Sequence, residues 1–229
     1  MPAFRAILRF GGSVLCVSGV LLLIDATLTI VWQEPVSALI ATRNQTALDD
    51  QIKRDFALFA RRTEASGAST PSDRGDLRAA ARRFERSTQT GRAIGRISLP
   101  SLGRRYVMVQ GTDTESLRKG PAHYPDTPLP GQGGTIGIAG HRTTYLAPFR
   151  TIDRLRRGDR IVVTMPYGRF TYSVRRTRIV RPEDVGVKRP VGYEQVILSA
   201  CHPLYSAAKR IIVFARLVRA EPLPSGPRR

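Results

Sequence analysis

Hydrophobic positions are spaced differently in three regions of the chain, and the first region is one continuous apolar stretch. Residues 10–32 carry a single charge, Asp25. As a helix the stretch would be about 34 Å long, enough to cross the roughly 30 Å hydrocarbon core of a membrane. Arg5 and Arg9 precede it, and basic residues favour the cytoplasmic side. The pattern therefore predicts a transmembrane anchor at 10–32, with 1–9 in the cytoplasm.

A cleaved signal peptide is the alternative interpretation of this first stretch. The apolar core is long for a signal peptide, and no clear A-x-A cleavage site follows it. We therefore expect a single-pass protein of the cell membrane whose main domain is extracytoplasmic.

Apolar residues at helical spacing follow the anchor. Four of them recur at intervals of four, four and three, which predicts one face of a helix over about 35–63: Leu48, Ile52, Phe56 and Phe59. This helix is either a stalk that continues from the membrane or a core helix of the main domain. Composition predicts a linker at 66–75, and a short basic helix is expected at about 76–88. Together these segments form a helical stalk and linker at 33–94.

From about residue 95 the pattern changes to short runs of β-branched and aromatic residues separated by turns. The runs are RISLP, YVMVQ, GTIGIAGH, RIVVTM, FTYSVRRTRIV, EQVILSAC and RIIVFARL. Seven or eight strands in about 125 residues predict a mainly β domain, a closed or nearly closed barrel over 95–220. Only short helices fit between the strands, at about 113–119 and 148–156. The tail at 221–229 is expected to be disordered.

Charge and cysteine content narrow the classes of function. The chain has 37 Lys and Arg against 18 Asp and Glu, a formal charge of +19. This balance indicates anionic surroundings, and nucleic acid, anionic lipid and acidic wall polymer are all compatible with it. Two cysteines cannot make a disulfide framework. Because Cys16 lies in the anchor, Cys201 is the one thiol outside it and a candidate reactive group.

The barrel region contains residue types suited to nucleophilic chemistry at strand ends. Cys201 ends one run, Arg210 begins the next, and His141 ends a third, so the three can share one rim of a barrel. His202 is adjacent to the cysteine and points to the opposite strand face. His123, in a loop, is a weaker candidate for the base. A thiol activated by a histidine, with a guanidinium to meet an oxyanion, describes acyl transfer through a thioester.

Structural roles for the same residues remain open at this point. The cysteine can be a small buried hydrophobic residue, the histidine a structural one and the arginine a solvated surface charge. A zinc site is also open: Cys201, His202, His141 and His123. The short paired spacings of structural zinc sites are absent, so we expect no metal and no cofactor.

These residues resemble the sortase family of membrane-anchored cysteine transpeptidases. In that family a strand ending T-L-x-T-C is followed by an arginine that opens the next strand, and here VILSAC is followed by HPLYSAAKR. The family histidine follows a glycine-rich strand, as in GIAGHR here. The resemblance covers about 95–220 and implies an eight-stranded barrel with His141, Cys201 and Arg210 as the catalytic triad. CHP and AGHRT are most similar to class E, and class D is next.

The resemblance also implies a substrate and a reaction. Cys201 would attack the Thr–Gly carbonyl of an LPxTG-like sorting signal on a surface protein, LAxTG in class E. His141 would protonate the leaving amine, and the amine of a peptidoglycan precursor, or less expectedly a pilin lysine, would resolve the thioester. The chain departs from the family at Ala200, where a threonine is usual and is thought to help substrate binding. Ala200 and His123 are the expected substrate-binding positions.

Two other functions are weighed against this one. An L,D-transpeptidase acting on wall peptides also pairs cysteine with histidine, but that family expects S-H-G-C, which SACHP lacks. A non-enzymatic, basic, membrane-tethered binding module would need no triad. We expect no nucleic-acid partner.

Overall fold

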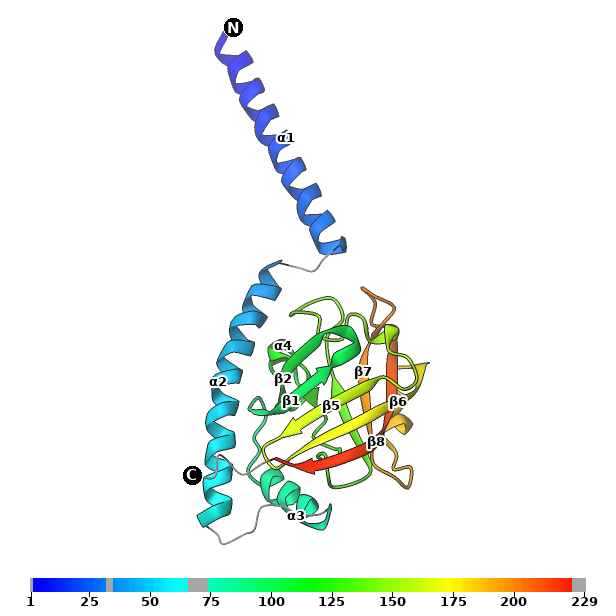
Figure 1. Ribbon diagram of the computed structural model, residues 1–229. Helices are drawn as coiled ribbons and strands as arrows, with labels where there is room; N and C mark the ends of the chain where they lie inside the picture. Colours follow the sequence, from blue (N-terminus) through cyan, green and yellow to red (C-terminus); the bar gives the residue numbers. More distant parts are fainter. Residues whose placement is uncertain (1, 32–34, 66–73, 224–229) are drawn as a thin grey trace.

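Three helices precede a β-barrel along the chain (Figure 1). The computed structural model describes residues 2–31, 35–65 and 74–223. The helices are α1 (Pro2–Val31), α2 (Pro35–Ala65) and α3 (Arg74–Glu85). Most of the expected linker, and the end of the expected tail, lie outside the described residues.

The barrel is closed by eight strands, which confirms the mainly β prediction. Its strands are β1 (Ala93–Leu99), β2 (Arg104–Gln110), β3 (Ala122–His123), β4 (Thr135–Ala139), β5 (Arg160–Met165), β6 (Gly168–Val180), β7 (Gln195–His202) and β8 (Lys209–Pro222). Around the barrel the order is β1-β2-β3-β4-β7-β8-β6-β5. The pairs β2–β3 and β4–β7 are parallel, and the other pairs are antiparallel.

Several local expectations differ from the observed elements. The expected helix at 148–156 is only the 3₁₀ turn η2 (Ile152–Arg154), whereas α4 (Thr114–Lys119) forms near its expected place. The strand β3 was not expected, and it places His123 in the sheet rather than in a loop. Two residues are too few to show an alternating pattern, so only pairing with β2 and β4 identifies β3.

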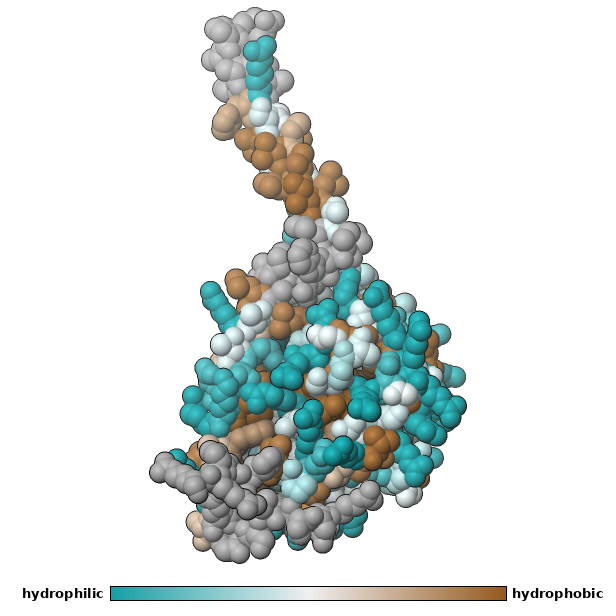
Figure 2. Space-filling model, in the orientation of Figure 1, coloured by the Kyte–Doolittle hydropathy of each residue, from teal (hydrophilic) through white to brown (hydrophobic). Residues whose placement is uncertain are grey.

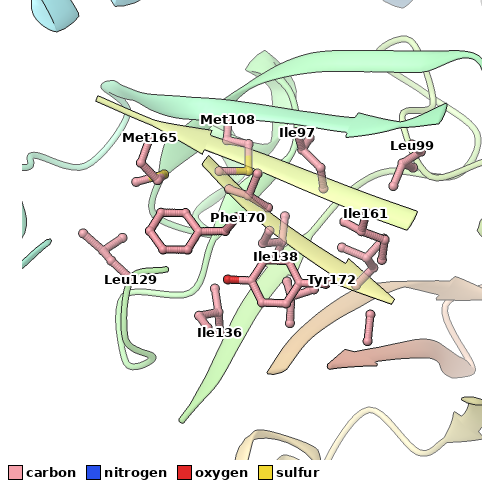
Figure 3. Packing of buried hydrophobic residues seen from close by; sticks show 14 of the residues in the cluster. Ile97, Leu99, Met108, Leu129, Ile136, Ile138, Ile161, Met165, Phe170 and Tyr172 are labelled. Carbon is pink, nitrogen blue, oxygen red and sulfur yellow. The ribbon is translucent and has the colours of Figure 1, made fainter. Parts of the chain in front are cut away.

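Alternation along the strands separates the barrel interior from its outer face. Large apolar side chains fill the interior, among them Phe170 and Tyr172, which are fully buried (Figure 3). On β7 the side chains of Val196, Leu198 and Ala200 belong to this interior cluster. Ile197 instead packs with residues of β6 and β8 in a separate cluster on the outer face.

The helix α2 packs lengthwise on the barrel, which decides between a free stalk and a packed helix. Leu48 and Ile52 are buried against a patch from β1, β2 and β3: Ala93, Val107, Val109 and Ala122. The side-chain amide of Gln45 donates to the carbonyl of Val107 at 3.1 Å and accepts from its N–H at 2.8 Å. Burying two such aliphatic side chains stabilises the contact by about 1.5–3 kcal/mol each.

The helix α1 stands apart from the barrel and has the character of a membrane span. Residues Arg9–Thr27 are long and apolar enough to cross a membrane, and none of that window is buried in the protein. Figure 2 shows hydrophobic side chains along α1, while hydrophilic side chains dominate this face of the barrel.

Candidate active site

Cys201 and Arg210 are direct partners across the antiparallel pair β7–β8. Side chains of directly opposite residues project from the same face of a sheet. The neighbours on β7 at even spacing, Ile197 and Ser199, lie on the outer face, so the thiol also projects outward, away from the barrel core. Cys201 is half-buried and free of any disulfide.

The parallel pairing of β4 with β7 brings His141 to the same rim. Ala139 pairs with Ser199, and the N–H of Gly140 donates to the carbonyl of Ser199 at 3.0 Å. Continuing this register by two residues places His141 beside Cys201, on strands that are about 4.8 Å apart. His141 therefore follows β4 at the rim of the barrel where Cys201 and Arg210 are paired.

The loop after His141 has a strained backbone held by specific contacts. Tyr145, Leu146 and Ala147 have φ values of 50°, 64° and 40°, in the left-handed region that non-glycine residues avoid. The N–H of Tyr145 donates to the Ser37 hydroxyl of α2 at 3.3 Å, and its ring lies 5.2 Å from the ring of His141. Such strain costs about 1–3 kcal/mol per residue and is concentrated at functional sites.

Burial and a neighbouring charge both lower the pKa of the His141 imidazole. Desolvation lowers the pKa of His141 below its usual value, and the positive charge of Arg118 lowers this pKa further. The guanidinium of Arg118 also lies over the ring of Tyr145, 5.8 Å from its centroid. The neutral imidazole, which can accept a proton from a thiol, is therefore favoured near neutral pH.

A buried arginine, Arg142, joins the two strand ends, and our sequence analysis did not identify it. Its side chain is 3% exposed. It donates to the carbonyl of Arg150 from Nε at 3.3 Å and from Nη2 at 3.0 Å. Nη1 donates to the carbonyl of Cys201 at 3.4 Å and lies 3.3 Å from Nδ1 of His202. Nη2 also forms an ion pair with Asp153 at 2.9 Å.

No pattern in the sequence indicates this role for Arg142. The residue follows His141 directly in GHR, but a basic residue in a loop is normally solvated. A buried guanidinium needs several acceptors, and here these come from two segments, 150–153 and the end of β7, which only the folded chain brings together.

A groove of about 90 Å³ leads to the cysteine–arginine pair along the outer face of β7 and β8. The 3₁₀ helix η3 (Val185–Lys188) forms one wall. Its lining mixes apolar side chains with polar and charged ones: Val180, Val185, Val187, Ile197 and Ile212, and Tyr124, Arg181, Asp184, Lys188, Ser199 and Arg210. The hydroxyl of Tyr124 donates to that of Ser199 at 3.4 Å. The groove is suited to a short extended peptide.

A glycine in β4 and another just after it allow aromatic rings to approach the backbone beside the site. A Cβ on Gly137 would lie 2.6 Å from the ring of Tyr124, which lines the groove. A Cβ on Gly140 would lie 2.6 Å from the ring of Phe149, in the loop that follows His141. Contacts this short do not occur for real side chains, so the positions of both rings depend on glycine.

The other residues singled out from the sequence lie away from the groove. The side chain of Ala200 faces the barrel interior. His123 is buried, with Nδ1 2.9 Å from the Gln110 side-chain oxygen and Nε2 3.0 Å from the carbonyl of Pro128. Burial lowers the pKa of His123. His202 follows Cys201 on β7, and its ring lies against Arg142 rather than beside the thiol.

Among the described residues, no group of three or more His, Cys, Asp or Glu side chains is placed to hold a metal ion. A larger pocket, about 740 Å³, lies elsewhere, beside α3 and the loop before β4. Its lining includes Leu77, Phe170 and Arg216 but no histidine or cysteine. Pocket size therefore does not identify the active site. The side chains beside the smaller groove identify it.

Comparison with known proteins relates this arrangement to a family. A family model described as a sortase domain matches residues 97–218. Sortase D of Bacillus subtilis (strain 168) is 32% identical over 185 residues, which cover 79% of this chain and 88% of that protein.

Solved structures give the same result. Sortase E from Streptomyces avermitilis is 34% identical with a TM-score of 0.55, and the match covers 61% of this chain and 97% of that one. Sortase E1 from Streptomyces coelicolor, solved with a tripeptide in the active site, is 26% identical with a TM-score of 0.57, and the match covers 62% and 98% of the two chains.

Proposed function

Because the chain belongs to the sortase family of cysteine transpeptidases, we propose that it cleaves a sorting signal on surface proteins and transfers them to the cell wall. Cys201 is the nucleophile, His141 the acid and base, and Arg210 the group that stabilises the oxyanion. The observation that carries this proposal is the strand register, in which the cysteine is flanked by the arginine on β8 and the histidine beyond β4.

The reaction proceeds through a thioester. The thiolate sulfur of Cys201 attacks the Thr–Gly carbonyl carbon of an LPxTG-like or LAxTG-like segment, and the carbonyl oxygen becomes an oxyanion. The intermediate collapses, the C–N bond breaks, and protonated His141 gives its proton to the leaving glycine amine. An acceptor amine, proposed to belong to a peptidoglycan precursor, then attacks the thioester, passes a proton to His141 and releases the thiolate.

The contacts of Arg210 suit it to oxyanion stabilisation. Within the described part of the chain, Nη1 donates to the carbonyls of Ala207 at 2.9 Å and Lys209 at 3.0 Å. These bonds fix the guanidinium, which has five N–H donors in all, so Nε and Nη2 remain to meet a negative oxygen. A donor fixed before the reaction needs no reorganisation when charge develops, which is the source of its catalytic effect.

The groove supports a peptide as the substrate. Its apolar side chains can accept the leucine of a sorting signal, and the hydroxyl groups of Ser199 and Tyr124 can bind peptide groups. Sortase E1, which has a similar structure, was solved with a tripeptide in its active site, and this supports a peptide substrate here. Ala200 contributes through its backbone, because its side chain faces the interior.

The test is cleavage and transfer by the full chain in detergent, with LPxTG and LAxTG peptides and an added amine. Wild type should release the glycine-containing fragment and form the amine adduct, and Cys201→Ala should do neither while keeping its circular dichroism spectrum. The matched control is Cys16→Ala, which removes the other thiol and should leave turnover unchanged. Turnover by Cys201→Ala would refute the assignment of the nucleophile.

Arg210→Lys separates the two roles open to this arginine. Lysine keeps the charge but lacks the planar fork, so an oxyanion loses one of two placed donors. We expect kcat to fall about 10²–10³-fold with little change in KM, as for other lost oxyanion donors. A rise in KM with unchanged kcat would instead assign Arg210 to binding the peptide before the reaction.

A further inference from the structure

The end of the barrel that carries the site is close to the membrane end of the chain. The candidate span ends at Thr27, α1 ends at Val31 and α2 begins at Pro35. An extended chain covers at most about 3.6 Å per residue, so Pro35 lies within about 15 Å of the end of α1. Adding one helical turn after Thr27 keeps it within roughly 20 Å of the end of the span.

The first turn of α2 also touches the site. The hydroxyl of Ser37, which is buried, accepts a hydrogen bond from the N–H of Tyr145, whose ring lies against His141. In Figure 1 the start of α2 and the loop between β7 and β8 lie at the same end of the barrel, toward α1. The catalytic end is therefore the end of the barrel where α2 begins.

This end carries exposed apolar side chains on two elements. Leu39 and Ile40 on α2 are 57% and 47% exposed, and Leu204 and Tyr205 in the β7–β8 loop are 38% and 54% exposed. The loop after His141 connects the two, because the guanidinium of Arg150 lies 5.9 Å from the centre of the Tyr205 ring. We call these four exposed residues the apolar rim.

Positive charge accompanies the apolar rim. Arg43 on α2 and Lys209 at the start of β8 are both exposed. The first acidic residue of α2 is Asp49, about 21 Å along the helix from its start. Two acidic residues near the site already pair with arginines: Asp153 with Arg142, and Glu115 with Arg118. Apolar side chains among cations are the composition of a surface that lies on anionic lipid.

We propose that the apolar rim lies in the headgroup region of the membrane from which α1 emerges, and that anionic lipid holds it there. The proposal rests on the anchor that the sequence predicts at 10–32, and it does not depend on the reaction proposed for the site. The consequence is that the groove opens at the lipid surface, so a peptide reaches Cys201 only where it runs close to the bilayer.

Quenching of tryptophan fluorescence by brominated lipid tests this position directly. The chain has one tryptophan, so Trp32→Phe provides a background without tryptophan. Single tryptophan probes are introduced into this background on the apolar rim, as Leu39→Trp or Leu204→Trp. Val218→Trp is the matched control probe away from the rim. Val218 is 56% exposed and nine residues along β8 from Lys209, about 30 Å from the catalytic end.

Each variant is reconstituted as the full chain in vesicles of phosphatidylcholine and phosphatidylglycerol that contain brominated phosphatidylcholine, and flotation confirms insertion. Both rim probes should lose emission at least about twofold, because interfacial side chains lie about 5–10 Å into the headgroup region, while the Val218 probe should not. Vesicles without phosphatidylglycerol, or high salt, should reduce the quenching at the rim. Rim probes that are quenched no more than the Val218 probe would overturn the proposal.

Charge placed in the rim provides the second test. Leu39→Glu with Ile40→Glu should abolish quenching of the Leu204→Trp probe, whereas the control Leu58→Glu, further along α2 and 49% exposed, should leave it unchanged. Unchanged quenching in the double variant would also overturn the proposal. Peptide cleavage in detergent is measured in parallel. Quenching without cleavage would refute only the assignment as a transpeptidase, and cleavage without quenching would refute only the membrane contact.

Discussion

Replacing Arg142 tests whether a buried guanidinium holds the cysteine strand and the histidine strand in register. Arg142→Met keeps much of the side-chain volume and removes every donor. The carbonyls of Arg150 and Cys201 then lose their partner, at about 1–3 kcal/mol each for buried groups. The ion pair with Asp153 adds only about 0–1 kcal/mol, because that carboxylate is 49% exposed.

The expected loss in the free energy of unfolding therefore lies between about 2 and 7 kcal/mol, with about 3–5 kcal/mol as the middle of that range. For a protein of this size each kcal/mol lowers the Tm by about 2–4 °C, so a fall of roughly 6–20 °C is expected. The measurement is thermal unfolding of the wild type and the variant in the same detergent. Asp153→Asn is the matched control, and it should cost less than about 1 kcal/mol.

A purely structural role for Arg142 predicts only the lower Tm, whereas a positioning role also predicts slower catalysis. Well below the Tm, Arg142→Met should lower kcat/KM for a sorting peptide about tenfold or more, since small displacements of reacting groups are costly. Most of that loss should fall on kcat, because the groove is built from other residues. Arg142→Lys, which keeps the charge and a donor, should restore part of it. A variant with a lowered Tm but unchanged kcat would refute the positioning role, and an unchanged Tm would refute the stability estimate.

Three further predictions address the histidine, the stalk and the groove. Arg118→Gln removes the charge that helps to lower the pKa of His141, so this pKa should rise and the imidazole should be protonated from a higher pH downward. NMR titration measures the pKa of His141, which Arg118→Lys should leave unchanged. In 1 M salt the pKa difference between wild type and Arg118→Gln should shrink. Ile52→Ala should reduce the free energy of unfolding by about 2–4 kcal/mol, because the side chain is fully buried between α2 and the barrel; a cost below about 1 kcal/mol in denaturant titration would mean that α2 is not firmly docked. Gly137→Ala should displace Tyr124 from the groove and raise KM more than it lowers kcat, and an unchanged KM in steady-state cleavage would show that this ring does not contact substrate.

Local patterns in the sequence predicted most of the elements, because spacing along the chain reflects which side chains are buried. The four apolar residues expected on one face of the helix at 35–63 do pack toward the barrel on α2. The seven apolar runs all became strands, and β3, with only two residues, was missed because it is defined by its neighbours. The placement of Cys201 and Arg210 followed from the short loop between two adjacent strands, which forces the two residues to face each other.

Contacts between distant segments were decided only by the tertiary structure. The sequence could not show that α2 packs on the barrel, that Ala200 faces the interior, or that Arg142 is buried. Whether a guanidinium is buried depends on which segments pack against it. Which side chains of a strand face the interior depends on its register, because a shift of one residue moves every side chain to the other face. Three residue types near strand ends indicated the chemistry of the site from the sequence. Its groove, its buried Arg142 and its contact with the start of α2 exist only in the folded chain.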